Sequence, residues 1–139
     1  MAELARIGIA ISEDLLAEFD ALIAKRGYTN RSEAFRDLIR NELVNEISAS
    51  AGAEVCGAII LLYNHHARLL LDKLNDLQHH YYAAILSSVH VHLDHDNCLE
   101  AILVRGKSSL VEELANALIA TKGVKHGRFV VTTSGRNLH

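Results

Sequence analysis

Apolar and polar positions alternate along residues 6–11, a pattern typical of a short strand. Ile7, Ile9 and Ile11 then share one face of that strand. A lone strand has no partner for its backbone hydrogen bonds, so we expect it to pair with the same segment of a second copy as an antiparallel ribbon. The first prediction for the chain is therefore a symmetric dimer joined through its N-terminal strands.

Two helices are expected after this strand, because the apolar period changes from two residues to about 3.6. Ser12 is expected to cap the first helix and Gly27 to end it. Asn30 and Glu33 form a pair resembling a capping box at the start of the second helix. The first part of the chain is therefore expected to be a βαα domain.

Small residues fill positions 48–53 and predict a linker. The remainder has the order strand, helix, strand, strand, helix, strand, which is the split βαβ pattern of ferredoxin-like folds. Strands are expected at 55–63, 82–93, 98–104 and 128–133, and helices at 67–78 and after a capping box of Ser109 and Glu112. We therefore predict an α+β protein with a βαα domain over residues 1–47 and a βαββαβ domain over residues 54–139.

Composition narrows the class of protein only modestly. No apolar run approaches the roughly 20 residues that a membrane helix needs, and the N-terminus has no secretory signal. The two cysteines do not make a disulfide framework, so a cytoplasmic protein with reduced thiols is expected. Nine histidines in 139 residues are unusual, and most of them fall within residues 65–95.

His90 and His92 are the most informative of these histidines. They lie two apart on a predicted strand, so both rings project from one face. Turn-forming residues 94–97 then reverse the chain, and Cys98 opens the adjoining strand. Each residue alone is more simply a sheet residue or a small buried side chain. Together, and with His79 shortly upstream, they predict a metal site, because imidazole and thiolate suit borderline-soft metals.

The N-terminal ribbon predicts a DNA-binding surface, since a two-stranded ribbon fits into the major groove. Residues 1–50 hold six Lys and Arg against nine Asp and Glu, a net charge of 6 − 9 = −3. DNA affinity must therefore come from the placement of a few groups. We expect Arg6 to lie on the ribbon, and the helix N-terminus at Asn30 and Arg31 to bind phosphate.

The chain resembles the nickel-responsive transcriptional regulators (NikR-like), in which a ribbon-helix-helix domain precedes an ACT-type, ferredoxin-like domain. The motifs that carry the resemblance are Gly-Tyr-Thr-Asn-Arg-Ser-Glu-Ala at 27–34, Arg-Asp-Leu-Ile-Arg at 36–40, Gln-His-His at 78–80 and the run from His90 to Glu100. The resemblance implies a square planar Ni(II) site. Its ligands would be His90, His92 and Cys98 of one subunit and His79 of a neighbour in a homotetramer, a dimer of dimers.

The resemblance also implies the function and the supporting residues. Nickel occupancy would permit binding to a palindromic operator in double-stranded DNA and repression of nickel uptake genes. A potassium-like ion would lie at Glu33 and Asp37, although Arg36 or Arg40 could neutralise this pair instead.

Three further residues are expected around the metal. Glu100 could orient a ligand imidazole, or it could be a surface carboxylate. His65 could bind excess metal or close a hydrogen-bond network near Tyr63, or it could be a solvated histidine.

One departure from the family pattern supports a second hypothesis. Family members commonly carry hydroxyl side chains on the outward face of the ribbon, where this chain has Arg6, Gly8 and Ala10. Gly8 has no side chain to reach a base, and Ala10 offers only apolar contact with a thymine methyl group. The alternative to a repressor is therefore a metal buffer or sensor module with weak or lost DNA recognition. An enzyme is not expected, because four protein donors leave the metal no open coordination position.

Overall fold

The computed structural model describes residues 3–48, 50, 52–136 and 138–139. The chain divides into two compact units, Met1–Asn41 and Glu42–His139. Among the residues described, no helix has the length and apolar character needed to cross a lipid bilayer.

Two helices form the N-terminal part, α1 (Glu13–Lys25) and α2 (Arg31–Ser48). Each begins at a predicted cap. The Ser12 hydroxyl accepts the backbone N–H of Leu15 at 3.2 Å, and the Asn30 side chain accepts the backbone N–H of Glu33 at 2.9 Å. These bonds satisfy backbone donors that the first turn of a helix leaves free. Both predicted caps are confirmed.

Gly27 ends α1 as the sequence predicted. Its φ of +87° lies in the left-handed region that favours glycine. The N–H of Gly27 donates to the carbonyl of Ala24 at 3.1 Å, and the N–H of Tyr28 donates to that of Ile23 at 3.0 Å. This double closure is a Schellman motif, and it turns the chain into α2.

The predicted strand over residues 6–11 is not formed within the single chain. Residues 3–12 contain neither helix nor strand, and Ile7, Ile9 and Ile11 are 78%, 54% and 40% exposed. The reason is physical. A strand needs a hydrogen-bonded neighbour, and this segment has no neighbouring strand among the described residues of its own chain.

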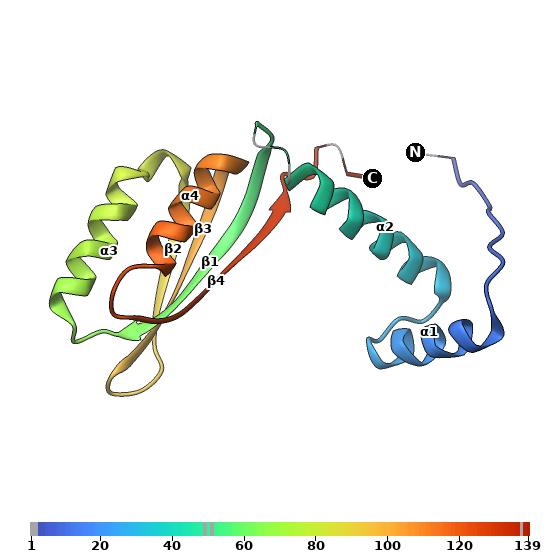
Figure 1. Ribbon diagram of the computed structural model, residues 1–139, viewed down its shortest axis with the longest axis horizontal. Coiled ribbons are helices and arrows are strands. Elements are labelled where there is room, and N and C mark those ends of the chain that lie inside the picture. Colours follow the sequence, from blue (N-terminus) through green and yellow to red (C-terminus); the bar gives the residue numbers. More distant parts are fainter. Residues whose placement is uncertain (1–2, 49, 51, 137) are drawn as a thin grey trace. The chain divides into compact units, whose positions relative to one another are not determined.

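A four-stranded sheet with two helices on one face forms the second unit (Figure 1). Its elements are β1 (Glu54–Asn64), α3 (Arg68–His80), the short 3-10 helix η1 (Tyr82–Ala84), β2 (Ile85–His92), β3 (Asn97–Lys107), α4 (Ser108–Ile119) and β4 (Val124–Thr133). The strand order is β2-β3-β1-β4, and every neighbouring pair is antiparallel. This arrangement confirms the predicted ferredoxin-like βαββαβ order.

Three local predictions for this unit need correction. Residues 82–84 form a 3-10 turn rather than the start of a strand, because the N–H of Ala84 bonds back to the carbonyl of Tyr81 at 2.9 Å. The capping box of Ser109 and Glu112 is wrong, since α4 begins at Ser108, which places Ser109 inside the first turn, and no side chain caps the helix. The predicted linker at 48–53 begins inside a helix, because α2 includes Ser48, and residues 49 and 51 lie outside those described.

The two faces of the sheet differ sharply. The face under α3 and α4 holds a core of buried residues: Val55, Ile59, Leu61, Tyr63, Leu70, Leu74, Cys98, Ile102, Val104, Val111, Leu114, Ala115 and Leu118. Alternation along the strands turns other apolar residues to the opposite face. Val89, Val91, Leu103 and Val130 lie there and are 52%, 48%, 45% and 62% exposed. One apolar face of the sheet is therefore uncovered in the single chain.

The backbone at Gly27 gives a test with a matched control. Gly27→Ala forces a side chain into the left-handed region and should lower the free energy of unfolding by about 1–2 kcal/mol. Gly8→Ala should change it much less, because a Cβ there has nothing within 4 Å and φ is not in that region. Urea unfolding of both variants measures the difference, and equal losses would contradict this role for Gly27.

Candidate functional site

The predicted ligands on β2 and β3 lie on the same face of the sheet. The strand register places His92 opposite Cys98 and His90 opposite Glu100. Cys98 is buried, and its Sγ lies 3.9 Å from Nδ1 of His90. Two ligands that each lie about 2.0–2.3 Å from one ion are themselves about 3–4 Å apart. The structure therefore brings His90 and Cys98 to a separation that one metal ion can span.

A buried carboxylate holds the His90 ring in place. Glu100 is only 1% exposed, and its oxygens accept hydrogen bonds from the Tyr63 hydroxyl at 2.7 Å, Gln78 Nε2 at 3.0 Å and Ser88 Oγ at 2.9 Å. Nε2 of His90 lies 3.1 Å from the same carboxylate. A carboxylate on Nε2 favours the proton there, which leaves Nδ1 as a free donor atom on the side of Cys98. This burial rules out the reading of Glu100 as a surface carboxylate.

Tyr63 closes the other side of this network. It is fully buried, and its hydroxyl oxygen lies 3.3 Å from Nδ1 of His90. Burial, with a smaller contribution from the hydrogen bond to Glu100, raises the pKa of Tyr63 far above its usual range. The phenol therefore stays protonated and donates to Glu100. Gln78 and Ser88 complete the set of groups around Glu100. The sequence analysis included Gln78 only as part of the motif at 78–80 and gave it no role, and it did not name Ser88, whose only signal was proximity to His90 in sequence.

The other two predicted ligands are not drawn into this cluster. The ring of His92 stacks on that of His65, with ring centroids 4.3 Å apart and planes 7° apart. His79 is exposed in the last turn of α3. Among the described residues, the one group of three or more metal-ligating side chains whose ligand atoms all lie within 4.8 Å is His66, His95 and Asp96. The four predicted nickel ligands thus do not form such a group within a single chain.

The turn between β2 and β3 is held by Asp94. Its carboxylate accepts hydrogen bonds from the Asn97 side chain at 3.0 Å and from the backbone N–H groups of Asn97 and Asp96 at 2.7 and 2.9 Å. These bonds stabilise the ionised carboxylate, the Asn97 side chain most strongly, and lower the pKa of Asp94 to about 2. The turn that delivers Cys98 to β3 therefore has a defined shape.

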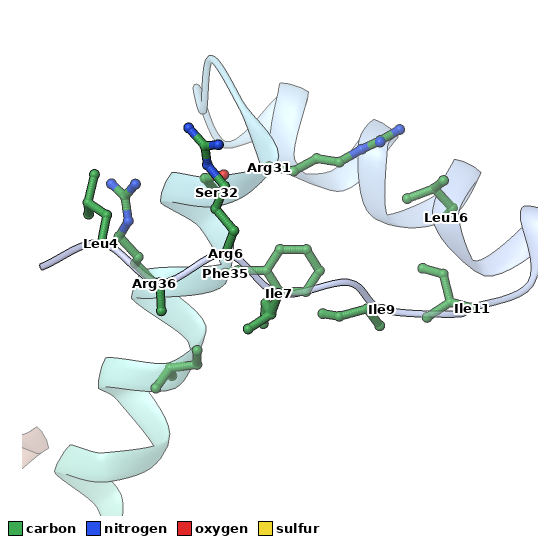
Figure 2. A pocket seen from close by; sticks show the side chains of 12 residues that line it. Leu4, Arg6, Ile7, Ile9, Ile11, Leu16, Arg31, Ser32, Phe35 and Arg36 are labelled. Carbon is green, nitrogen blue, oxygen red and sulfur yellow. The ribbon is translucent and has the colours of Figure 1, made fainter.

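The N-terminal segment lines an open apolar groove of about 710 Å³ (Figure 2). The residues around it are Leu4, Ala5, Arg6, Ile7, Ile9, Ile11, Leu16, Arg31, Ser32, Phe35, Arg36 and Ile39. Arg6, Gly8 and Ala10, the predicted DNA contacts on this segment, are all exposed.

The remaining predicted contacts of the first unit have partners within the chain. Arg31 binds the Asp20 carboxylate through Nε at 2.9 Å and Nη2 at 2.8 Å. The side chain of Asn30 is engaged in its cap. Nothing in the sequence pattern indicated the pairing with Asp20. Any phosphate contact by Arg31 must therefore compete with this ion pair. The backbone at Asn30 still lies at the start of α2, where a phosphate was predicted to bind.

Of the two carboxylates in α2 that were predicted to bind a cation, one already has partners within the chain. Asp37 accepts the Tyr28 hydroxyl at 2.6 Å and Nη1 of Arg40 at 3.2 Å. Neutralisation by Arg40 was the alternative that the sequence left open, and it is present here. Glu33 is exposed in the first turn of the same helix. A potassium-like ion at Glu33 and Asp37 stays a prediction.

Fold and motifs together define a class: a two-helix unit, preceded by a segment with the alternation of a strand, and a ferredoxin-like domain that carries a His and Cys cluster. Comparison with known proteins agrees. Residues 5–46 match the family of ribbon-helix-helix proteins of the copG type, and residues 56–132 match the NikR C-terminal nickel-binding domain.

Relatives match over almost the whole chain. A protein named as a nickel-responsive regulator from Solibacter usitatus is 57% identical over 99% of both chains. One from Geotalea uraniireducens is 54% identical over the full length of both, and one from Thermococcus kodakarensis is 47% identical over 96% of both. The chain belongs to the family of nickel-responsive regulators.

The Asp94 turn gives a pH prediction. Because its pKa is lowered from 3.8 to about 2, the stability that this carboxylate contributes is present above pH 3.8 and lost as the pH falls through about 2. NMR titration of the Asp94 side chain should place its midpoint near that lower value. Asn97→Ala removes the hydrogen bond that lowers this pKa most and should raise the midpoint, and an unchanged titration in this variant would contradict the assignment.

Proposed function

We propose that this protein is a nickel-responsive transcriptional repressor, which binds a palindromic operator in double-stranded DNA when Ni(II) is bound and represses nickel uptake genes. The observation that carries the proposal is the pairing of His90 Nδ1 with the Cys98 thiol above a buried Glu100, within a domain of the NikR C-terminal type. A repressor acts where the chromosome lies, so we place the protein in the cytoplasm.

The proposed nickel ligands are His90, His92 and Cys98 of one subunit and His79 of a neighbouring subunit. Three imidazoles and a thiolate are borderline-soft donors, and a planar set of such donors suits Ni(II) or Cu(II) better than tetrahedral Zn(II). Cu(II) binds such donors at least as tightly, so selection for nickel depends on geometry and metal supply. In this scheme the His92 ring leaves its stack on His65 when the ion binds.

Two uncovered apolar surfaces support assembly into a dimer of dimers. Ile7, Ile9 and Ile11 are exposed beside the groove of the first unit, where a second copy of the segment would supply the missing strand. The open sheet face around Val91 and Val130 offers a second surface for another copy. A homotetramer uses both surfaces, and it also supplies the His79 that the single chain leaves outside the site.

Arg6 of the paired ribbon is proposed to read the DNA, and the helix start at Asn30 to hold a phosphate through its backbone amides. Gly8 and Ala10 add little hydrogen-bonding capacity, so operator choice depends on Arg6 and on DNA shape. Because the metal is shared between subunits, it favours one arrangement of the DNA-binding dimers. The gain in DNA affinity can be no larger than the difference in metal affinity between the two arrangements.

The thiolate ligand gives the first test. Cys98→Ala should abolish the thiolate-to-nickel charge-transfer absorption and stoichiometric Ni(II) binding, because it removes the one sulfur ligand. Cys56→Ala is the matched control and should keep both, since Cys56 is the other free thiol and lies outside the cluster. Absorption spectra during Ni(II) titration measure the outcome. An unchanged titration of the Cys98 variant removes the thiolate from the site.

The DNA switch is tested separately. Selection from a random-sequence pool with Ni(II) bound should yield a palindromic site, and gel retardation of that site should require nickel. Arg6→Ala should weaken retardation at least about tenfold, the effect expected from losing a good base contact of about 1–3 kcal/mol per subunit. Equal retardation with and without metal would reject the switch.

The second candidate is a metal buffer or sensor module whose first unit only dimerises it. Gly8 and Ala10 favour this alternative, because neither residue can donate a side-chain hydrogen bond to a base. Failure of the nickel-loaded protein to select any DNA would establish this alternative over the repressor.

A further inference from the structure

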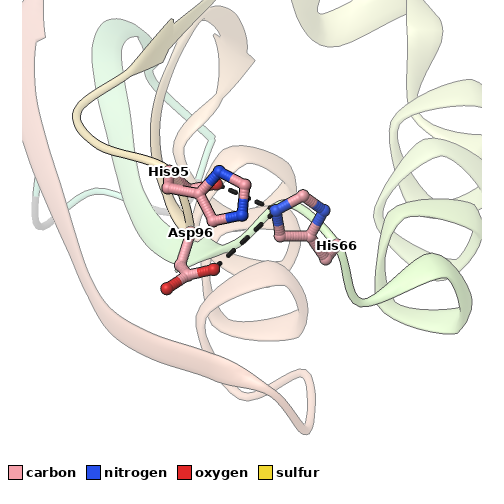
Figure 3. Close-up of side chains that lie close together, drawn as sticks. All are labelled: His66, His95 and Asp96. Atoms are coloured by element: carbon pink, nitrogen blue, oxygen red, sulfur yellow. Dashed lines mark hydrogen bonds and ion pairs between the residues drawn. The ribbon is translucent and has the colours of Figure 1, made fainter.

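A second group of metal-ligating side chains lies where two loops meet, outside the four proposed nickel ligands. His66 lies between β1 and α3, and His95 and Asp96 belong to the turn between β2 and β3 (Figure 3). One ligand atom from each of the three residues lies within 4.8 Å of the others. His66 Nε2 is 3.8 Å from Asp96 Oδ1, and both side chains are about half exposed, at 51% and 59%.

A backbone hydrogen bond connects the two loops without any bound ligand. The N–H of His65 donates to the carbonyl of Asp96 at 3.0 Å, and the N–H of His66 donates to the Asn64 side chain at 2.8 Å. Asp94 fixes the other loop from within the turn. The three side chains therefore extend from a backbone that hydrogen bonds already hold in place. Only the side chains need to move for the three residues to coordinate one ion.

The His66 ring already bonds to an acceptor in this junction. Its Nε2 lies 2.9 Å from the carbonyl oxygen of His95, which also lies 2.7 Å from Nε2 of His65. Nε2 is also the ring nitrogen that lies near Asp96, so it gives up this hydrogen bond when it binds a metal. The carbonyl of His95 then keeps its bond from His65, and the loop backbone stays satisfied.

We propose that His66, His95 and Asp96 form a second, solvent-facing site for a borderline divalent cation such as Ni(II) or Zn(II). Two imidazoles and one carboxylate suit such ions, and water would complete the coordination. The site contains no sulfur, and it is more exposed than the Cys98 cluster. It should therefore bind more weakly and give no thiolate charge-transfer absorption.

The proposal is tested in a protein whose sulfur ligand is already gone. Ni(II) alone is titrated into Cys98→Ala protein by calorimetry, with circular dichroism as the check on folding. This variant has lost the tight stoichiometric binding at the thiolate site, so we expect only a separate, weaker binding event that saturates at about one ion per subunit. Adding His66→Gln or Asp96→Asn should weaken it at least about tenfold, since even loss of a supporting partner costs 10–100-fold in metal affinity. His126→Gln, an exposed histidine on β4, is the matched control and should leave binding unchanged.

The outcomes separate this site from the proposed function. Absence of residual Ni(II) binding in the Cys98→Ala protein overturns the second site. Residual binding that is unchanged by His66→Gln and by Asp96→Asn overturns it as well. Failure of the repressor proposal has a different signature, because the wild-type protein would then lack the charge-transfer absorption or the nickel-dependent DNA retardation. The second site can therefore be confirmed even when the first is not.

Discussion

The buried carboxylate of Glu100 is the constraint on which the site depends. A charged group that is 1% exposed must have partners, because leaving one unpaired in a protein interior costs about 3–5 kcal/mol. Tyr63, Gln78 and Ser88 donate to it, and His90 presents Nε2 to it. Satisfying this one group therefore orders residues from β1, α3 and β2 at once. The free nitrogen of His90 faces Cys98 as a result.

Two apolar surfaces are uncovered in the single chain, and both follow from the alternation of residues along extended segments. The N-terminal segment has the period of a strand but no neighbour to pair with, so its isoleucines stay exposed. The sheet has helices on one face only, although apolar residues alternate onto both. Exposed apolar surfaces of this kind are expected of a chain that associates with copies of itself, and they agree with the proposed nickel site, which takes one ligand from a neighbouring subunit.

Much of the fold could be predicted because it is encoded locally. The caps at Ser12 and Asn30 and the stop at Gly27 depend on neighbouring residues, and the structure confirms them. The capping box at Ser109 failed because a sequence match does not reveal where the preceding strand ends. In the site, spacing alone placed His90 and His92 opposite residues of the next strand. The pairing of Arg31 with Asp20, and the parts of Gln78 and Ser88, depend on contacts across elements that periodicity does not encode.

Gln78 has a consequence beyond its hydrogen bond. It binds Glu100 at 3.0 Å and directly precedes His79 in the last turn of α3. The same carboxylate that aims the His90 ring thus also anchors the backbone from which His79 extends. If His79 serves an adjacent subunit, one acidic residue orients donors for two separate ions, its own and its neighbour's. Binding of one ion would then affect the position of a ligand for the next ion, because both ligands are oriented by the Glu100 side chain.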